Sequence, residues 1–159
     1  NVGDRFELMD VADDSGYWQR DHVGRALAKL DFDRDGRQDF VVTHVGETSA
    51  LLLNRTESTN HWFQLEIVGA VSERDAIGSR VVVRTGDVEL SEWLNAGDGF
   101  LCRNEPVLSF GLGNALSLDE VVIHWPSGKR QTFRDVKADQ RYLLVEGQTE
   151  LFPFVDMVD

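Results

Sequence analysis

The sequence predicts an all-β protein, and three observations support this. Runs rich in Val, Ile, Leu, Phe and Trp recur about every ten residues, and Gly, Asp and Asn separate them, which is the spacing of strands and turns. Helical periodicity is hard to find along the chain. Several runs alternate apolar and polar residues. The predicted strands are residues 26–30, 39–44, 50–54, 61–69, 79–85, 88–95, 107–110, 120–125, 130–134 and 142–146.

The predicted strand at residues 61–69 shows the alternation most clearly. Phe63, Leu65 and Ile67 fall on one face, and Gln64 and Glu66 fall on the other. This pattern is expected for an antiparallel strand with one buried and one solvated face.

A hairpin is predicted after the strand at residues 120–125. The sequence Trp125-Pro126-Ser127-Gly128 has Pro at the second turn position, where its fixed φ fits, and Gly at the fourth. Lys129 then begins the return strand.

Composition limits the classes of partner. The 159 residues include 16 Lys and Arg against 28 Asp and Glu, a formal charge of −12, and the acid excess runs along the whole chain. Such a charge repels nucleic acid and anionic lipid. No apolar stretch approaches the roughly 18 residues of a membrane span, so neither nucleic acid binding nor membrane insertion is expected. The single cysteine, Cys102, cannot form an intramolecular disulfide and says nothing about the redox compartment.

The strongest chemical signal is a DxDxDGxxD run at residues 31–39. Ca²⁺ takes about six to eight oxygen ligands, and alternate carboxylates on a tightly curled loop can converge on one ion. Gly36 permits the sharp turn. The alternative is a solvated acidic turn. The predicted ligands are the side chains of Asp31, Asp33, Asp35 and Asp39 and the backbone carbonyl of Arg37.

The loop differs from an EF-hand. An EF-hand needs a bidentate Glu at the twelfth loop position and a helix on each side. Val42 occupies that position here, and the flanking segments are short and β-like. We therefore expect a permanent structural clamp rather than a calcium sensor.

The first third of the chain resembles one FG-GAP (VCBS-type) repeat, the calcium-binding blade of integrin-α-like β-propellers. The resemblance rests on Val23-Gly24-Arg25-Ala26, the Asp-rich loop, Phe40-Val41-Val42-Thr43 and Leu51-Leu52-Leu53-Asn54-Arg55, with Gly3-Asp4-Arg5-Phe6-Glu7 resembling the stretch that links such repeats. A single blade cannot close a ring, and the chain opens at Asn1 without a signal sequence. We expect a piece of a longer secreted protein.

The remainder resembles the ASPIC/UnbV domain. The motifs are Asn60-His61-Trp62, Arg74-Asp75-Ala76-Ile77-Gly78-Ser79-Arg80-Val81, Gly97 with Gly99-Phe100, Leu108-Ser109-Phe110-Gly111-Leu112-Gly113 and Val121-Val122-Ile123-His124-Trp125-Pro126-Ser127-Gly128. The resemblance implies an extracellular, calcium-associated and mostly non-enzymatic module. The expected divisions are 1–58 for the FG-GAP/VCBS-like repeat, 59–148 for an antiparallel β-sandwich-like ASPIC/UnbV domain, and 149–159 for a tail or edge strand.

These observations predict a non-enzymatic calcium-binding interaction or adhesion module that is secreted, extracellular, periplasmic or at the cell surface. Its partner would be an extracellular protein or glycan. The alternative is a carbohydrate-binding module or an accessory domain of a secreted polysaccharide-processing protein, which exposed Trp18 or Trp93 beside carboxylates would favour. A glycoside hydrolase is a weaker third option, because no spacing singles out a carboxylate pair. Neither HExxH nor GxSxG occurs, and we expect no enzyme.

Overall fold

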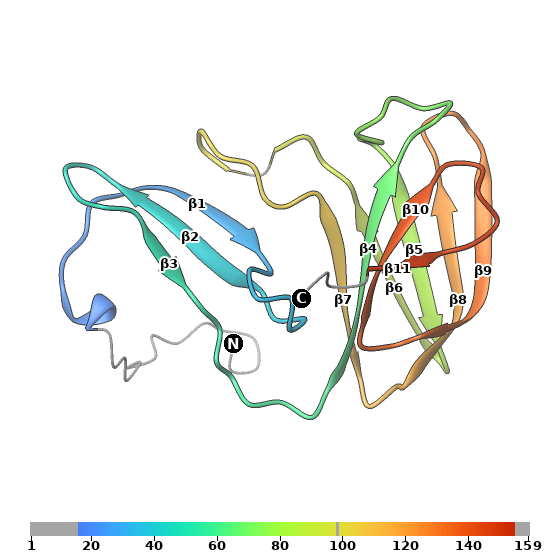
Figure 1. Cartoon of the computed structure of the whole chain (residues 1–159), viewed down its shortest axis with the longest axis horizontal. Helices are drawn as coiled ribbons and strands as arrows, with labels where there is room; N and C mark the ends of the chain where they lie inside the picture. The colour runs from blue at the N-terminus through green and yellow to red at the C-terminus, as the bar shows by residue number, and fades with distance from the viewer. Residues whose placement is uncertain (1–15, 98, 155–159) are drawn as a thin grey trace, which may run out of the picture.

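Three β-sheets make up the chain in the computed structural model, which describes residues 16–97 and 99–154. The Gly3–Glu7 stretch and the end of the predicted tail lie outside these residues. A short 3₁₀ helix (Tyr17–Gln19) precedes a three-stranded sheet of order β1-β2-β3, and two four-stranded sheets of order β11-β10-β4-β7 and β6-β5-β8-β9 follow (Figure 1). The strands are β1 (Gly24–Leu30), β2 (Asp39–His44), β3 (Ala50–Leu52), β4 (His61–Val68), β5 (Arg80–Thr85), β6 (Val88–Trp93), β7 (Val107–Gly113), β8 (Ser117–His124), β9 (Arg130–Lys137), β10 (Gln140–Val145) and β11 (Phe152–Pro153). Within the described part of the chain, no helix has the length and apolar character needed to cross a membrane.

The hydrophobic core lies between the two four-stranded sheets. Phe63 and Leu65 of β4 and Val121 and Ile123 of β8 are fully buried in one cluster, and Figure 1 shows the two sheets face to face. The predicted all-β, sandwich-like fold is confirmed. One pairing departs from the antiparallel expectation, because β10 runs parallel to β4.

The predicted hairpin joins β8 to β9. The N–H of Gly128 donates to the carbonyl of Trp125 at 2.9 Å, and the N–H of Trp125 donates to the carbonyl of Lys129 at 2.9 Å. Gly128 has φ +85°, a left-handed conformation that favours glycine. The hairpin aligns Ile123 with Gln131 and places the buried Trp125 at its end.

The polar face predicted for β4 is only partly solvated. Gln64 is only 1% exposed, because the loop between β1 and β2 packs against this side of β4 and the Gln64 amide donates to Asp31 at 2.7 Å. The expectation of a water-facing Gln64 was wrong, because the three-stranded sheet covers part of the sandwich.

A second contact joins the three-stranded sheet to the sandwich along the outer edge of β1. Asn104 Oδ1 accepts the N–H of Lys29, and the N–H of Glu105 donates to the carbonyl of Lys29, both at 2.9 Å. Cys102 Sγ donates to the carbonyl of Leu27 at 3.1 Å. The segment that precedes β7 therefore pairs with β1 at alternate residues, where a neighbouring strand would otherwise lie.

Candidate metal centre and adjoining groove

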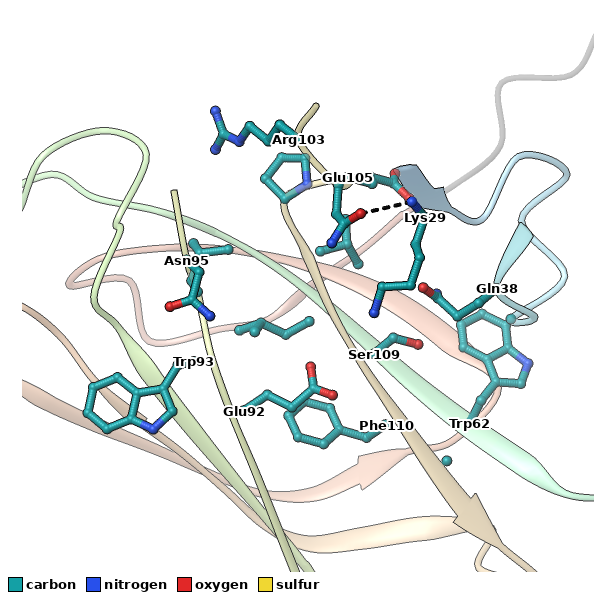
Figure 2. Close-up of a pocket in the computed structure, with 17 residues that line it drawn as sticks. Lys29, Gln38, Trp62, Glu92, Trp93, Asn95, Arg103, Glu105, Ser109 and Phe110 are labelled. Atoms are coloured by element: carbon teal, nitrogen blue, oxygen red, sulfur yellow. Dashed lines mark hydrogen bonds between the residues drawn. The ribbon is translucent and has the colours of Figure 1, made fainter. Parts of the chain in front are cut away.

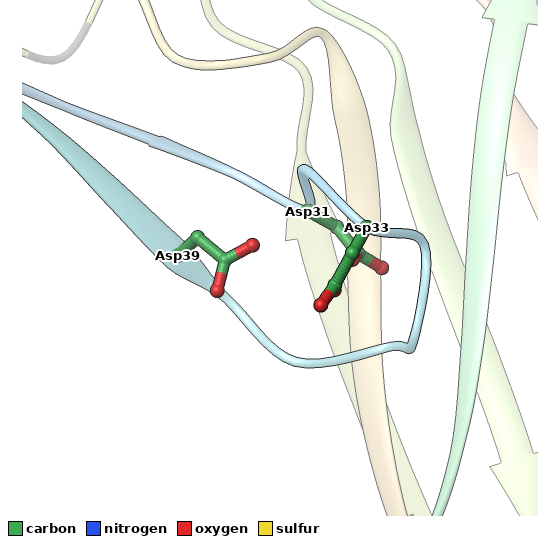
Figure 3. A group of neighbouring side chains, drawn as sticks. All are labelled: Asp31, Asp33 and Asp39. Carbon is green, nitrogen blue, oxygen red and sulfur yellow. The ribbon is translucent and has the colours of Figure 1, made fainter. Parts of the chain in front are cut away.

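Three carboxylates converge in the loop that joins β1 to β2. One oxygen from each of Asp31, Asp33 and Asp39 lies within 4.8 Å of the others, and Figure 3 shows the three side chains gathered within the loop. Asp31 and Asp39 are 4% and 1% exposed, whereas Asp33 is exposed to solvent. Within residues 16–97 and 99–154, this is the acidic group whose spacing suits a cation.

Backbone hydrogen bonds to Asp31 hold the first half of the loop in its curl. The Asp31 carboxylate accepts the N–H of Asp35 at 3.1 Å and that of Gly36 at 2.8 Å. Gly36 has φ +87°, and a Cβ at this position would lie 2.2 Å from the Trp62 ring. Glycine is therefore required both by the turn and by the close approach to Trp62.

Asp39 closes the other end of the loop. Its carboxylate accepts the N–H of Phe32 at 2.9 Å and the N–H of Asn54 at 2.7 Å. The exposed Asp33 pairs with Arg55 at 2.8 Å. The segment after β3 thus helps to position both Asp39 and Asp33.

Two of the five predicted ligand residues take part in a different contact. The Arg37 guanidinium pairs with the Asp35 carboxylate and donates to the carbonyl of Asn54 at 2.8 Å. The structure therefore brings Asp31, Asp33 and Asp39 together and turns the Asp35 carboxylate toward Arg37. The three carboxylates that converge in the loop are therefore fewer than the predicted ligands.

Two residues that the sequence analysis did not single out support Asp31 from the sandwich. Gln64 Nε2 donates to Asp31 Oδ2. Glu105 accepts the Asp31 N–H at 3.1 Å and, through its other oxygen, Arg141 at 2.6 Å. Burial raises the pKa of Asp31, and the hydrogen bond from Gln64 partly opposes this rise. The alternation of apolar and polar residues in β4 would have identified Gln64 as a partner of Asp31 only if it had been known that the loop packs on that face of the strand.

Arg141 extends this network toward the end of the described chain. Its guanidinium, which is mostly buried, also pairs with Glu66 at 2.9 Å. It lies 5.0 Å from the centre of the Phe154 ring, and the guanidinium of Arg34, a loop residue, lies 5.2 Å from the same ring. The residue after β11 is therefore packed between the loop and β10.

A groove adjoins the loop where the three sheets meet. Its cavity of about 380 Å³ lies between Lys29 of β1 and the edges of β6 and β7, and Glu92, Trp93 and Ser109 line it (Figure 2). Desolvation raises the pKa of Glu92, while the neighbouring Ser109 backbone and the attraction of Lys29 lower it.

The four tryptophans differ in their exposure to solvent. Trp18 and Trp93 are 58% and 57% exposed, whereas Trp125 is buried. Trp62 is half-buried against the loop at Gly36.

The histidines contact neighbouring side chains or backbone where the structure records partners. His61 Nδ1 lies 2.6 Å from Asp139, and His22 Nδ1 lies 3.0 Å from Glu47. His44 lies 2.9 Å from the hydroxyl of Tyr17. The spacing of these groups does not suggest zinc binding.

Comparison with known proteins places the chain in a family. The family described as ASPIC and UnbV matches residues 69–151. Cartilage acidic protein 1 of Xenopus tropicalis is 34% identical over 116 residues, covering 69% of this chain and 17% of the relative. The Mus musculus protein of the same name is 31% identical over 121 residues, covering 73% of this chain and 18% of the relative. The Homo sapiens protein is 33% identical over 104 residues, covering 62% and 15%. The chain thus spans less than a fifth of the length of the curated relatives it matches. With more than half of its residues matched by the family, this chain belongs to the ASPIC and UnbV family.

Proposed function

We propose that this chain is a non-enzymatic extracellular interaction module. In this proposal, Ca²⁺ held by the loop at residues 31–39 clamps an FG-GAP-like three-stranded sheet onto the ASPIC/UnbV domain. The observation that carries it is the convergence of Asp31, Asp33 and Asp39, two of them buried.

The donor set fits Ca²⁺. Carboxylate oxygens are the ligands that this hard cation prefers, and loop carbonyls and water can complete its shell. Burying Asp31 without a cation opposes its ionisation, first by desolvation and also by the charge of the nearby Asp35. A divalent cation removes both costs, so the native loop gains stability when it binds.

The contacts around Asp31 support a clamp that acts between units. Gln64 and Glu105 belong to the sandwich, and both contact Asp31 of the loop. An ion that fixes Asp31 would therefore also fix the docking of the three-stranded sheet. Strands β1 and β2 flank the loop, where a calcium sensor has a pair of helices that reorient, and this favours a structural ion over a sensor.

The proposed domain boundaries agree with this arrangement of a sheet docked on a sandwich. Residues 1–58 would be the FG-GAP/VCBS-like repeat, 59–148 the ASPIC/UnbV domain and 149–159 the tail or edge strand. The described three-stranded sheet, with its Asp-rich loop between the first two strands, supports the first assignment.

The proposed location is outside the cytoplasm. The similar proteins carry the name cartilage acidic protein, and this chain shares the acidity, with a net charge of −12. Extracellular modules can use weak calcium sites because millimolar Ca²⁺ surrounds them. The partner would be an extracellular protein, which the acidic surface would attract if it is basic.

Carbohydrate binding is a second candidate. Trp93 is 57% exposed at the rim of the groove, beside Glu92 and Asn95. Exposed indole faces beside polar groups suit the apolar faces of sugars. A glycan array probed with the parent chain and a Trp93→Ala variant tests this function, because a sugar-binding groove should lose its signal in the variant.

Thermal unfolding tests the calcium clamp. The chain is unfolded in excess EDTA and again with about 2 mM CaCl₂ or MgCl₂, a typical extracellular concentration range. At 100 times the dissociation constant, Ca²⁺ adds about 2.7 kcal/mol, which raises Tm by roughly 5–10 °C. Asp33→Asn should abolish the rise, and Asp35→Asn, whose carboxylate contacts Arg37, should retain most of it. No rise in the parent with either ion would overturn the calcium proposal.

A further inference from the structure

The outer edge of β7 faces the groove instead of another strand. β7 ends the sheet of order β11-β10-β4-β7, so among the described residues only β4 pairs with it. Figure 2 shows the strand running through the groove, with the Lys29 side chain pointing toward Ser109. Unpaired strand edges carry rows of backbone donors and acceptors that can add another strand.

The hydrogen bonds of β4 show which backbone groups point into the groove. The N–H of Trp62 donates to Asp139 at 3.3 Å, and the carbonyl of Trp62 accepts the N–H of Asp139 at 2.7 Å. Both groups of Trp62 are thus directed away from β7. Because Gly111 pairs with Trp62, its own N–H and carbonyl are directed away from β4 and toward the groove. Ser109, two residues earlier and paired with Gln64, has the same orientation, because the backbone groups of alternate residues in a strand point to the same side.

The available space follows this edge. A second cavity of about 470 Å³ contacts the first at Gly36, Trp62 and Gly111 and continues past His61 and Asp139. A Cβ at Gly111 would meet no atom within 4 Å. At about 3.4 Å per residue, the seven residues of β7 match an extended segment of six or seven residues.

Charge favours one kind of segment. Glu92 lines the groove together with Ser109 and Lys29. An added strand that used the outward N–H of Ser109 would lie along the edge that Glu92 also lines. A Lys or Arg side chain on that strand would then pair with Glu92, and the net charge of −12 attracts a basic partner from a distance.

We propose that the groove binds an extended, basic peptide segment of a partner protein as an additional strand on β7, at Ser109 and Gly111. This proposal rests on the interaction function proposed above and names its site and partner chemistry. The main-chain bonds of the added strand give affinity, and the side chain opposite Glu92 gives selectivity.

The test uses the whole chain in about 2 mM CaCl₂, the extracellular range, with blocked peptides of about eight residues, long enough to span β7. The peptides alternate Thr and Val and carry Lys, Glu or Gln at the centre. Binding is measured by calorimetry, and the amides of Ser109 and Gly111 are followed by NMR hydrogen exchange. The Lys peptide should bind about tenfold more tightly than the Glu peptide and protect both amides.

Two variants at one position separate strand addition from other modes of binding. Gly111→Pro removes the outward N–H while leaving the ladder to β4 intact, because proline is tolerated where the N–H faces away from the sheet. It should weaken Lys-peptide binding about tenfold. Gly111→Ala keeps the N–H and should bind as the parent does. Glu92→Gln should remove the preference for Lys over Glu, a readout that does not depend on how Gly111→Pro folds.

The outcomes distinguish this proposal from the broader one. If no peptide binds while Ca²⁺ still raises Tm, the groove proposal fails, and Glu92 instead guards the edge against strand addition. If the Lys peptide binds but Ca²⁺ has no effect on Tm, the calcium clamp fails and the groove stands. Binding of a glycan with unchanged exchange at Ser109 and Gly111, in place of peptide binding, overturns the groove proposal in favour of sugar recognition.

Discussion

Glu146, which directly follows β10, offers a sharp test of how this sandwich is held together. The side chain is 4% exposed. Its Oε2 accepts three backbone N–H groups, those of Ala70 at 3.0 Å, Val71 at 2.8 Å and Ser72 at 2.6 Å, and its Oε1 accepts the hydroxyl of Ser127 at 2.5 Å. The carboxylate thus ties the loop after β4 to the hairpin between β8 and β9. Glu146→Gln removes the charge and places an NH₂ group against one set of donors.

The expected loss follows from the pKa of Glu146. Burial alone would raise this pKa, but the hydrogen bonds from Ser127 and from the backbone of residues 70–72 lower it from 4.5 to about 2. One pKa unit corresponds to about 1.4 kcal/mol, so the carboxylate stabilises the native state by roughly 3 kcal/mol. We expect Glu146→Gln to cost roughly 2–4 kcal/mol, or 5–15 °C in Tm.

The pH dependence has a definite sign. Because the pKa of Glu146 is depressed in the folded state, its contribution is fully present above pH 4.5 and is lost as the pH falls toward about 2. Urea unfolding from about pH 7 to about pH 2.5 should therefore show the parent and Glu146→Gln converging in acid. Glu150→Gln, at an exposed position, is the matched control and should leave stability unchanged. A Glu146→Gln loss no larger than that of the control, or one that persists undiminished at the lowest pH, would refute this reasoning.

Three further substitutions test the junction between the loop and the sandwich. Gln64→Leu removes the hydrogen-bond donor to Asp31 and should lower the free energy of unfolding by about 1–3 kcal/mol. It should also raise several-fold the Ca²⁺ concentration that gives half of the maximal increase in Tm, which a titration of Tm with Ca²⁺ measures. Gly36 has φ +87° and lies against the Trp62 ring, so Gly36→Ala should lower the free energy of unfolding by about 1–3 kcal/mol. It should also shift the tryptophan fluorescence emission, and an unchanged emission would contradict the close packing. Glu105→Gln weakens its bonds to the buried arginine of β10 and to the loop, and urea unfolding should show a loss of about 1–2 kcal/mol that Glu57→Gln does not produce.

The local sequence pattern was sufficient to predict ten strands of this protein. Each of the ten predicted strands coincides with a strand of the structure, because alternating side chains and turn residues carry the signal within a few positions. The turn at residues 125–128 also follows from its own four residues. The short strand Phe152–Pro153 was foreseen only as a tail or an edge, since two residues carry no periodicity.

The supporting contacts could not be predicted because their partners are distant in sequence. Gln64 lies 33 residues from Asp31, and Glu105 lies 74 residues from it. Glu146 accepts its three backbone N–H groups from residues 74 to 76 positions earlier. The parallel pairing of β10 with β4 is equally non-local. In the loop itself, spacing identified the acidic residues but could not show that Arg37, two positions away, would take the Asp35 carboxylate.

The proposed ion site and the proposed peptide groove share structural elements, which makes the two proposals interdependent. Lys29 lies on β1 two residues before Asp31, and Gly36 of the same loop contacts Trp62 at the junction of the two cavities. An ion that fixes the loop therefore also fixes one wall of the groove, and Ca²⁺ should tighten binding of the Lys-containing peptide. Binding linkage is reciprocal, so a saturating concentration of that peptide must tighten Ca²⁺ binding by the same factor. Titrating each ligand with and without the other measures both factors. If neither ligand changes the affinity of the other, the loop does not shape the groove, even if each site binds its own ligand.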